Sequence, residues 1–468
     1  MLIVRAAGRA YDDSAPMSQR AQIKKALWLP LVIGGALAAA GGAAQKRAPT
    51  FSEDVLPVLA KRCQACHSPG EVAPMPLLTY EQTRPWAKAI RESVLSGQMP
   101  PWFAEPGVGR QFSNDRSLTR QEIDALVGWA DAGAPRGGTA AAPRPPRPTG
   151  SWRLGEPDLI YEMAEYQVPA SGTIEYTYYI IPTEFKEDRW VTAAELKVSA
   201  SPLVHHINAF IREPGNKRFL RGYPARTYFV PAGQGELGGG DLPADDPASL
   251  GGPNGGVFGE ILAPYEPGFF PSPWALGRAK LIKAGSDIVV QVHYTANGTA
   301  AADRTQLGLT FAKEPPRERV LTWAPANAKF VIPPGAASHR VDYAVTVMKD
   351  LKLLSMQPHM HLRGKSFEYR VVHPGGAAEV LLRVPRYDFN WQLNYYLSEP
   401  LPLAPGARLE FTAHYDNSAK NPWNPDPTAT VKWGDQSWEE MMIGFIEVAF
   451  DARLDANSVI HRMPAGGR

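Results

Sequence analysis

The stretch Leu351-Lys-Leu-Leu-Ser-Met-Gln-Pro-His-Met-His-Leu-Arg-Gly-Lys365 combines a short β-strand pattern with two closely spaced histidines. Side chains two residues apart in a strand point to the same face, so His359 and His361 can together hold one metal ion. Imidazole binds copper, zinc, iron and nickel alike, so this spacing leaves the metal open. The stretch therefore predicts a strand that carries a metal site.

Three more histidines form a second pattern. His205 and His206 are adjacent in Pro202-Leu-Val-His-His-Ile-Asn208, and His293 ends the strand-like run Val289-Val-Gln-Val-His-Tyr294. Adjacent residues of a regular strand point in opposite directions, so chelation by both requires a bulge or a strand end. A single histidine is more often a surface or core residue, but five in two such clusters predict metal sites.

Short β-like runs recur throughout the chain after residue 150. They cover residues 174–181, 190–198, 288–294, 351–356, 368–372 and 408–415. Turns rich in Gly and Pro separate them, and Gly (42) with Pro (45) forms about 19% of the 468 residues, against a typical ~12%. The pattern predicts two antiparallel, jelly-roll-like β-sandwiches, at 151–315 and 316–462, with a boundary near Pro315–Pro316.

The charge distribution excludes one class of partner. The net charge is +2, with 49 basic and 47 acidic residues interspersed along the chain. No basic stripe indicates a nucleic-acid surface, so we expect no nucleic-acid partner. Two cysteines cannot form a disulfide framework.

Both cysteines fall in Cys63-Gln-Ala-Cys66-His67, the C-x-x-C-H signature of covalent haem attachment. Two thiols at this spacing can reach the two vinyl groups of one porphyrin, and the adjacent imidazole can then bind the iron. A thioredoxin-like redox pair would not explain His67. The motif predicts one covalently attached haem c.

Helical patterns flank this motif. Thr50 or Ser52 is placed to cap a helix running into Cys63, and residues 117–133 read as an amphipathic helix stopped by Gly133. The apolar face of the second helix contains Leu118, Ile123, Leu126, Val127 and Trp129.

Residues 50–137 thus resemble a small, all-α class I cytochrome c. In that family a Met-Pro in a loop supplies the sixth iron ligand. Met99, in Met99-Pro-Pro-Trp102, matches that position, and Met75 is the alternative. Ligation of the haem iron by a histidine and a methionine implies a raised reduction potential, which suits electron transfer.

The chain ahead of residue 45 reads as an export segment. The apolar run 26–44 follows Arg20, Lys24 and Lys25 and ends in small residues, as a secretory signal does. Met17 is then the expected start, and an uncleaved membrane anchor is the alternative, the one case in which we expect a membrane partner. Either reading predicts an extracytoplasmic protein. Residues 138–150 form a Pro/Ala linker between the two parts.

The histidine patterns, taken together, resemble the copper type II, ascorbate-dependent monooxygenases. That family has two β-sandwiches, each carrying one copper across a solvent-filled cleft. The resemblance implies an electron-transfer copper on His205, His206 and His293. It also implies an oxygen-binding copper on His359, His361 and Met441, since Glu439-Glu-Met-Met-Ile443 matches the family's Glu-Met motif; Met442 is the alternative thioether. Thioether with imidazole favours Cu(I) over zinc.

One departure bears on the substrate. The peptide-amidating branch holds a substrate carboxylate with an Arg, an Asn and a Tyr. Gln357, Ile443 and Phe445 stand at those positions here and offer no cation. A peptidylglycine substrate is therefore not expected.

These interpretations predict a copper monooxygenase that uses O2 to hydroxylate a C–H bond of a small organic substrate. Its electron donor would be an ascorbate-like reductant or a redox protein, acting through the fused haem. Two alternatives stay open: a non-catalytic copper and haem electron-transfer or copper-binding protein, and a zinc hydrolase on a sandwich scaffold.

Overall fold

The computed structural model describes residues 47–138, 151–214, 228–229, 259–266, 271–434 and 436–462. The predicted export segment and all but the first residue of the predicted linker lie outside these residues. The chain divides into two units between Ala48 and Pro49, and all the described helices and strands belong to the second unit. No helix among the described residues is both long and apolar enough to cross a membrane.

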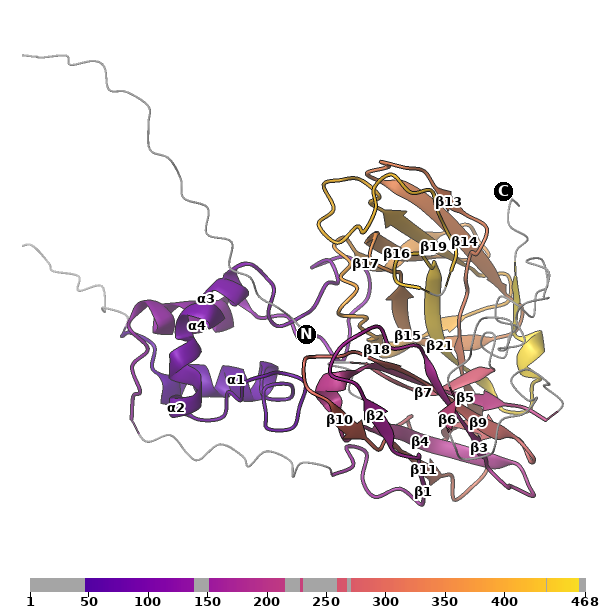
Figure 1. Ribbon diagram of the computed structural model, residues 1–468. Helices are drawn as coiled ribbons and strands as arrows, with labels where there is room; N and C mark the ends of the chain where they lie inside the picture. Colours follow the sequence, from indigo (N-terminus) through magenta and orange to yellow (C-terminus); the bar gives the residue numbers. More distant parts are fainter. Residues whose placement is uncertain are drawn as a thin grey trace, which may run out of the picture. The chain divides into compact units, whose positions relative to one another are not determined.

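The N-terminal part of this unit contains the helices (Figure 1). They are the π-helical turn η1 (Phe51–Val55), α1 (Leu56–Arg62), α2 (Tyr80–Thr83), the 3-10 turn η2 (Arg84–Trp86), α3 (Ala87–Leu95) and α4 (Arg120–Asp131). Leu59, Leu126 and Trp129 are fully buried in a small apolar core between them. Apolar residues three apart form the buried side of α1, with Leu56 and Leu59, and of α4, with Leu126 and Trp129, as the sequence predicts for α4.

Two details of these helices differ from expectation. Thr50 does not cap a helix through its side chain; its backbone N–H donates to Asp54 Oδ2 at 2.7 Å, and the chain starts with a π-helical turn instead. The cap of α4 is Thr119, which exchanges hydrogen bonds with Glu122. Helices α2 and α3 were not predicted, although Thr79 and Gln82 form the same kind of capping box at α2.

The rest of the described chain is mainly β-sheet, as the sequence predicts. The strands before Pro315 are β1 (Leu159–Glu162), β2 (Tyr166–Val168), β3 (Thr177–Pro182), β4 (Arg189–Lys197), β5 (Val204–Arg212), β6 (Tyr228–Phe229), β7 (Glu260–Tyr265), β8 (Arg278–Ile282), β9 (Asp287–Tyr294), β10 (Ala301–Asp303) and β11 (Gln306–Phe311). The 3-10 turn η3 (Ser201–Leu203) leads into β5.

The strands after Pro316 form the second half. They are β12 (Glu318–Trp323), β13 (Val331–Ile332), β14 (His339–Val347), β15 (Leu351–His359), β16 (Gly364–Val372), β17 (Ala378–Val384), β18 (Tyr395–Leu403), β19 (Arg408–Tyr415), β20 (Val431–Lys432), β21 (Ile443–Asp451) and β22 (Ile460–Arg462), with the 3-10 turn η5 (Ala456–Ser458) before β22.

Each half packs two sheets around its own apolar core. The first core lies between the sheet β6-β3-β9-β5-β7 and the strands β4 and β11. The second lies between the sheet β17-β16-β19-β14-β22 and the strands β12, β21, β15 and β18. Alternating burial along β19 and β21 shows the period of two that puts every second side chain into a core.

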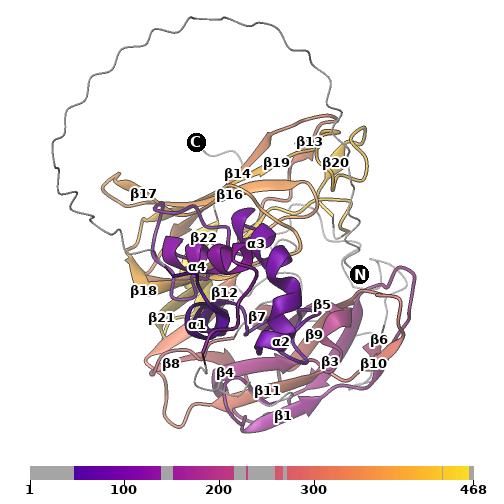
Figure 2. The ribbon, with the colours of Figure 1, turned by 90° about the vertical axis from the view of Figure 1, so that its left-hand side faces the viewer.

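The two halves share one sheet, which the sequence does not predict. Its order is β1-β11-β4-β8-β12-β21-β15-β18, and Figure 2 labels all of these strands except β15, which Figure 1 labels. The junction is a short parallel pairing of β8 with β12, with Glu318 opposite Arg278 and Arg319 opposite Ala279. Backbone hydrogen bonds therefore connect the two halves across the boundary at Pro315–Pro316.

A buried ion pair supports this junction. Arg319 of β12 donates to Glu260 of β7 at 3.0 Å, and both side chains are almost fully buried. Nearby, Lys280 of β8 donates to Thr322 of β12 at 2.6 Å. Charges removed from water in this way require partners, because an unpaired buried charge is strongly destabilising.

We expect Glu260→Ala to lower the free energy of unfolding by about 3–5 kcal/mol, because it leaves Arg319 buried without its carboxylate. The matched control is Arg304→Ala, which removes exposed pairs with Glu162 and Glu165 and should leave the free energy of unfolding almost unchanged. Urea unfolding followed by tryptophan fluorescence measures both. Equal losses in the two variants would contradict the role given to the buried pair.

Candidate metal centre

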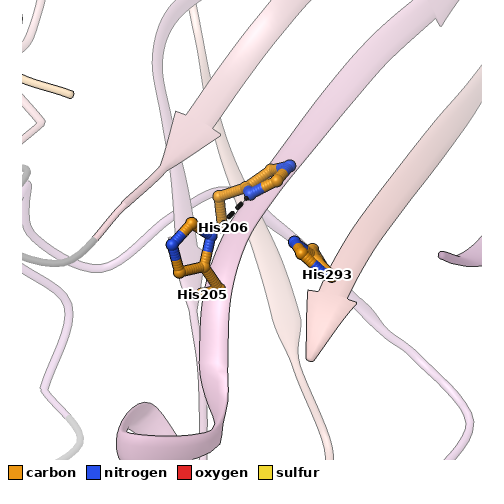
Figure 3. A group of neighbouring side chains, drawn as sticks. All are labelled: His205, His206 and His293. Carbon is orange, nitrogen blue, oxygen red and sulfur yellow. Dashed lines mark hydrogen bonds between the residues drawn. The ribbon is translucent and has the colours of Figure 1, made fainter. Parts of the chain in front are cut away.

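Two strands of the first half bring three histidines together (Figure 3). His206 of β5 lies directly opposite His293 of β9. The strand register shifts between Val204 and His206, so a bulge at His205 lets it join its neighbour. One ligand nitrogen from each of the three lies within 4.8 Å of the others. This is the local irregularity that chelation by two adjacent histidines requires.

The surroundings keep these imidazoles neutral. Burial, with the nearby His205 ring, lowers the pKa of His293 to about 4, and burial lowers the pKa of His206 well below its ordinary value. Metals bind the neutral imidazole, so no proton has to be displaced at pH 7. Nδ1 of His293 is buried and has no hydrogen-bond partner in the described structure. An unsatisfied nitrogen of this kind fits a metal ligand.

The second pair of histidines lies at the end of β15. The ring centroids of His359 and His361 are 5.3 Å apart, and Met360 between them is fully buried on the opposite side. His359 Nδ1 donates to Gln392 Oε1 at 2.5 Å, and His361 Nδ1 donates to the Glu439 carbonyl at 3.3 Å. With Nδ1–H used in this way, Nε2 of each ring carries the lone pair that can bind a metal.

Burial again controls the charge of these rings. It is the main cause that lowers the pKa of His359 to about 4 and that of His361 to about 3. A positive charge on His359 would lower the pKa of His361 further. Both rings are therefore neutral at pH 7.

The strand β21 places Met441 beside this pair. His359 is opposite Ile443 in the β15–β21 ladder, so the residues just before β21 reach the histidine end of β15. The Met441 carbonyl accepts a hydrogen bond from Tyr415 at 2.7 Å, and its side chain is partly exposed. Met442 is fully buried in the apolar core. Of the two methionines, Met441 is the one free to act as a thioether ligand.

Glu440 connects these residues. Its fully buried carboxylate accepts the backbone N–H of His361 at 2.8 Å and of Arg363 at 2.6 Å. Burial is the first cause that raises its pKa, to about 8. Sequence reasoning missed Glu440 as well as Gln392. The Glu-Met pair that Glu440 forms with Met441 was the available signal for the first, and nothing in the sequence marked the second.

The predicted haem residues lie in the helical part. Cys63 follows α1, and both thiols are partly buried and not bonded to each other. Burial raises the pKa of Cys63 to about 12, so this thiol is protonated. His67 Nδ1 donates to the Met75 carbonyl at 3.1 Å, which leaves Nε2 free to bind iron. Met75 packs against the helical core, and Met99 follows α3, where its N–H donates to the Ser93 carbonyl at 3.1 Å.

Four further histidines have other surroundings. His414, a candidate supporting residue, bonds Ser366 at 3.2 Å within the β16–β19 ladder. His373 forms a turn and pairs with Glu379. His339 and His461 lie on β14 and β22, and no described contact joins any of the four to the two histidine groups.

One region of the chain matches a known protein family. Residues 320–453 match the family model described as copper type II ascorbate-dependent monooxygenase, C-terminal domain. The matched stretch contains His359, His361 and Met441. The match supports copper as the metal and, at family level, an oxidoreductase of the monooxygenase type. The family's cosubstrates are O2, an organic substrate and an ascorbate-type reductant.

The other comparisons provide no evidence about the function of the chain. No curated protein matches the chain. Among solved structures, "The 2.6A structure of Infectious Bursal Virus Derived T=1 Particles" is 10% identical, covers 66% of this chain and 74% of its own, and has a TM-score of 0.18. "Crystal structure of infectious bursal disease virus VP2 subviral particle" is 10% identical, covers 67% of this chain and 79% of its own, and has the same TM-score of 0.18.

We expect Gln392→Leu to weaken copper binding at His359 and His361 by ~10–100-fold, because His359 Nδ1–H loses the acceptor that orients the ring. Gln392→Glu, which keeps an oxygen acceptor, should restore most of the affinity. Competition with a copper chelator measures the change at each site.

The control is Gln306→Leu, which removes an exposed amide that bonds Glu162. Its affinities should equal those of the unmodified protein. An unchanged affinity in Gln392→Leu would contradict the orienting role of Gln392.

Proposed function

We propose that this protein is an extracytoplasmic copper monooxygenase that inserts one atom of O2 into a C–H bond of a small organic substrate, with electrons delivered through a fused c-type haem domain. The observation that carries the proposal is the pair of neutral histidine groups, one in each sandwich. The second of them lies within the stretch that matches the monooxygenase model.

The two groups suit different roles. His205, His206 and His293 offer three imidazoles for one copper, which would store an electron. His359 and His361 with Met441 offer two imidazoles and a soft thioether, a donor set that favours Cu(I). Copper bound there would supply the activation of O2, so no protein nucleophile is needed.

Other residues of the chain orient the rings of His359 and His361. Gln392 and the Glu439 carbonyl hold the Nδ1 protons of the two histidines, so both rings present Nε2. Glu440 fixes the backbone at His361 and directly precedes Met441. These contacts set the ligand geometry before a metal arrives, which reduces the cost of ordering it.

The surroundings of this site favour a substrate without a carboxylate. Gln357 lies on the same face of β15 as His359, and its amide donates to both oxygens of Glu266, at 2.8 and 2.9 Å. Opposite these residues on β21 are Phe445 and Ile443. None of these four neighbours is a cation that would attract a substrate carboxylate.

A haem on Cys63, Cys66 and His67 would lie in a part of the chain that contacts the second sandwich. Arg386 donates to the Gly97 carbonyl at 3.1 Å, beside Met99. Further along, Glu105 pairs with Arg383 at 3.0 Å. These contacts, together with the predicted linker, support delivery of electrons from haem to copper within one chain.

Oxygen consumption tests the proposed activity. The copper-loaded, reduced protein with a reductant and candidate substrates should consume O2 beyond the amount that reoxidises its metals. Met441→Ala should lower this turnover at least ~100-fold, since a direct ligand should matter no less than its supporting residues. Met348→Ala, at an exposed methionine, is the control and should leave it unchanged. O2 uptake no greater than the amount that reoxidises the metals would favour a non-catalytic copper and haem protein.

Haem attachment is tested separately. With a c-type maturation system, Cys63→Ala and Cys66→Ala should each lose normal two-point attachment, read from the pyridine-haemochrome spectrum. Met99→Ala should keep the haem but lose the methionine–iron absorption band of the oxidised protein. Loss of that band in Met75→Ala instead would transfer the ligand role to Met75, and unchanged spectra in both cysteine variants would overturn the haem assignment.

A further inference from the structure

One aromatic ring lies between the two histidine groups. Phe389 belongs to the segment 385–394 that connects β17 with β18. Its ring stacks on His205 of the first sandwich with centroids 5.6 Å apart, and it meets His361 of the second edge-on at 5.9 Å. Both distances are typical of direct aromatic contact. The centroids of His205 and His361 are thus no farther apart than the sum of these two distances.

The position of Phe389 is fixed on both sides along the chain. Tyr387 OH donates to the Met360 carbonyl at 2.8 Å and accepts the Met360 N–H at 3.1 Å. Three residues beyond Phe389, Gln392 accepts the Nδ1 proton of His359. The segment is therefore attached to the strand end that carries His359 and His361, and the ring extends from it to His205.

We propose that Phe389 is a positioning residue that sets the separation of the two metal-binding groups. The family resemblance implies a solvent-filled cleft between the sites, but here a side chain contacts both ligand sets. The inference rests on the proposed function in that both groups bind copper. It assigns a role to a residue that belongs to neither ligand set.

Magnetic interaction between the two metals tests this spacing. In protein with two Cu(II) ions per chain by metal analysis, the EPR spectrum should show dipolar broadening from the neighbouring ion. Phe389→Ala should reduce or smear this broadening while both ions stay bound, because the ring no longer separates the groups at one distance. Phe389→Tyr, which keeps the ring, should restore it.

The matched control is Trp391→Ala. Trp391 lies on the same segment and packs against the same core, and no described ring contact joins it to a histidine. This variant should keep the broadening of the unmodified protein. Equal changes in Trp391→Ala and Phe389→Ala, or none in Phe389→Ala, would overturn the proposal.

A metal-free measurement separates this inference from the proposed function. With isotope-labelled histidines, Phe389→Ala should shift the NMR signals of both His205 and His361, because both rings lose the same aromatic neighbour. A shift at one ring or at neither would overturn the bridging role, whether or not copper binds. Failure to bind two coppers, with both rings shifted, would overturn the proposed function and leave the contact itself established.

Discussion

The antiparallel pairing of β15 with β21 is the interaction on which the second histidine site depends. It sets His359 opposite Ile443 and Gln357 opposite Phe445, so that residues 84 and 88 positions apart in the chain meet at one strand end. Backbone hydrogen bonds fix this register, and a slip by one residue would turn every side chain to the other face. Met442, which is now buried in the core, would then leave it.

The same sheet also relates the two sandwiches. Each has its own apolar core, and two separate cores alone would allow the halves to move independently. The β8–β12 pairing and the buried pair of Arg319 with Glu260 restrict that freedom. The contact of Phe389 with both His205 and His361 is compatible with such a junction, since a ring can bridge two groups only when their separation is fixed.

Burial has two consequences at these sites. It removes water from the imidazoles and so disfavours their charged form, which lowers the pKa values of His293, His359 and His361. It also requires that the remaining polar atoms find partners, which Gln392 and Glu440 supply. His293 Nδ1 is an exception among the described residues, and its position within the three-histidine group gives that exception a chemical reason.

The sequence by itself determined what depends on local spacing. Short β-like runs between turns rich in Gly and Pro predicted the β-rich body, and the two-residue spacing of His359 and His361 predicted that they share a face. Tertiary structure decided the rest, because it depends on residues distant in the chain. The bulge that brings His205 to His206 arises from pairing with β9, and the shared sheet arises from two residues of parallel contact between β8 and β12. Gln392 and Phe389 carry no local signature, since each acts only through a partner that the fold brings to it.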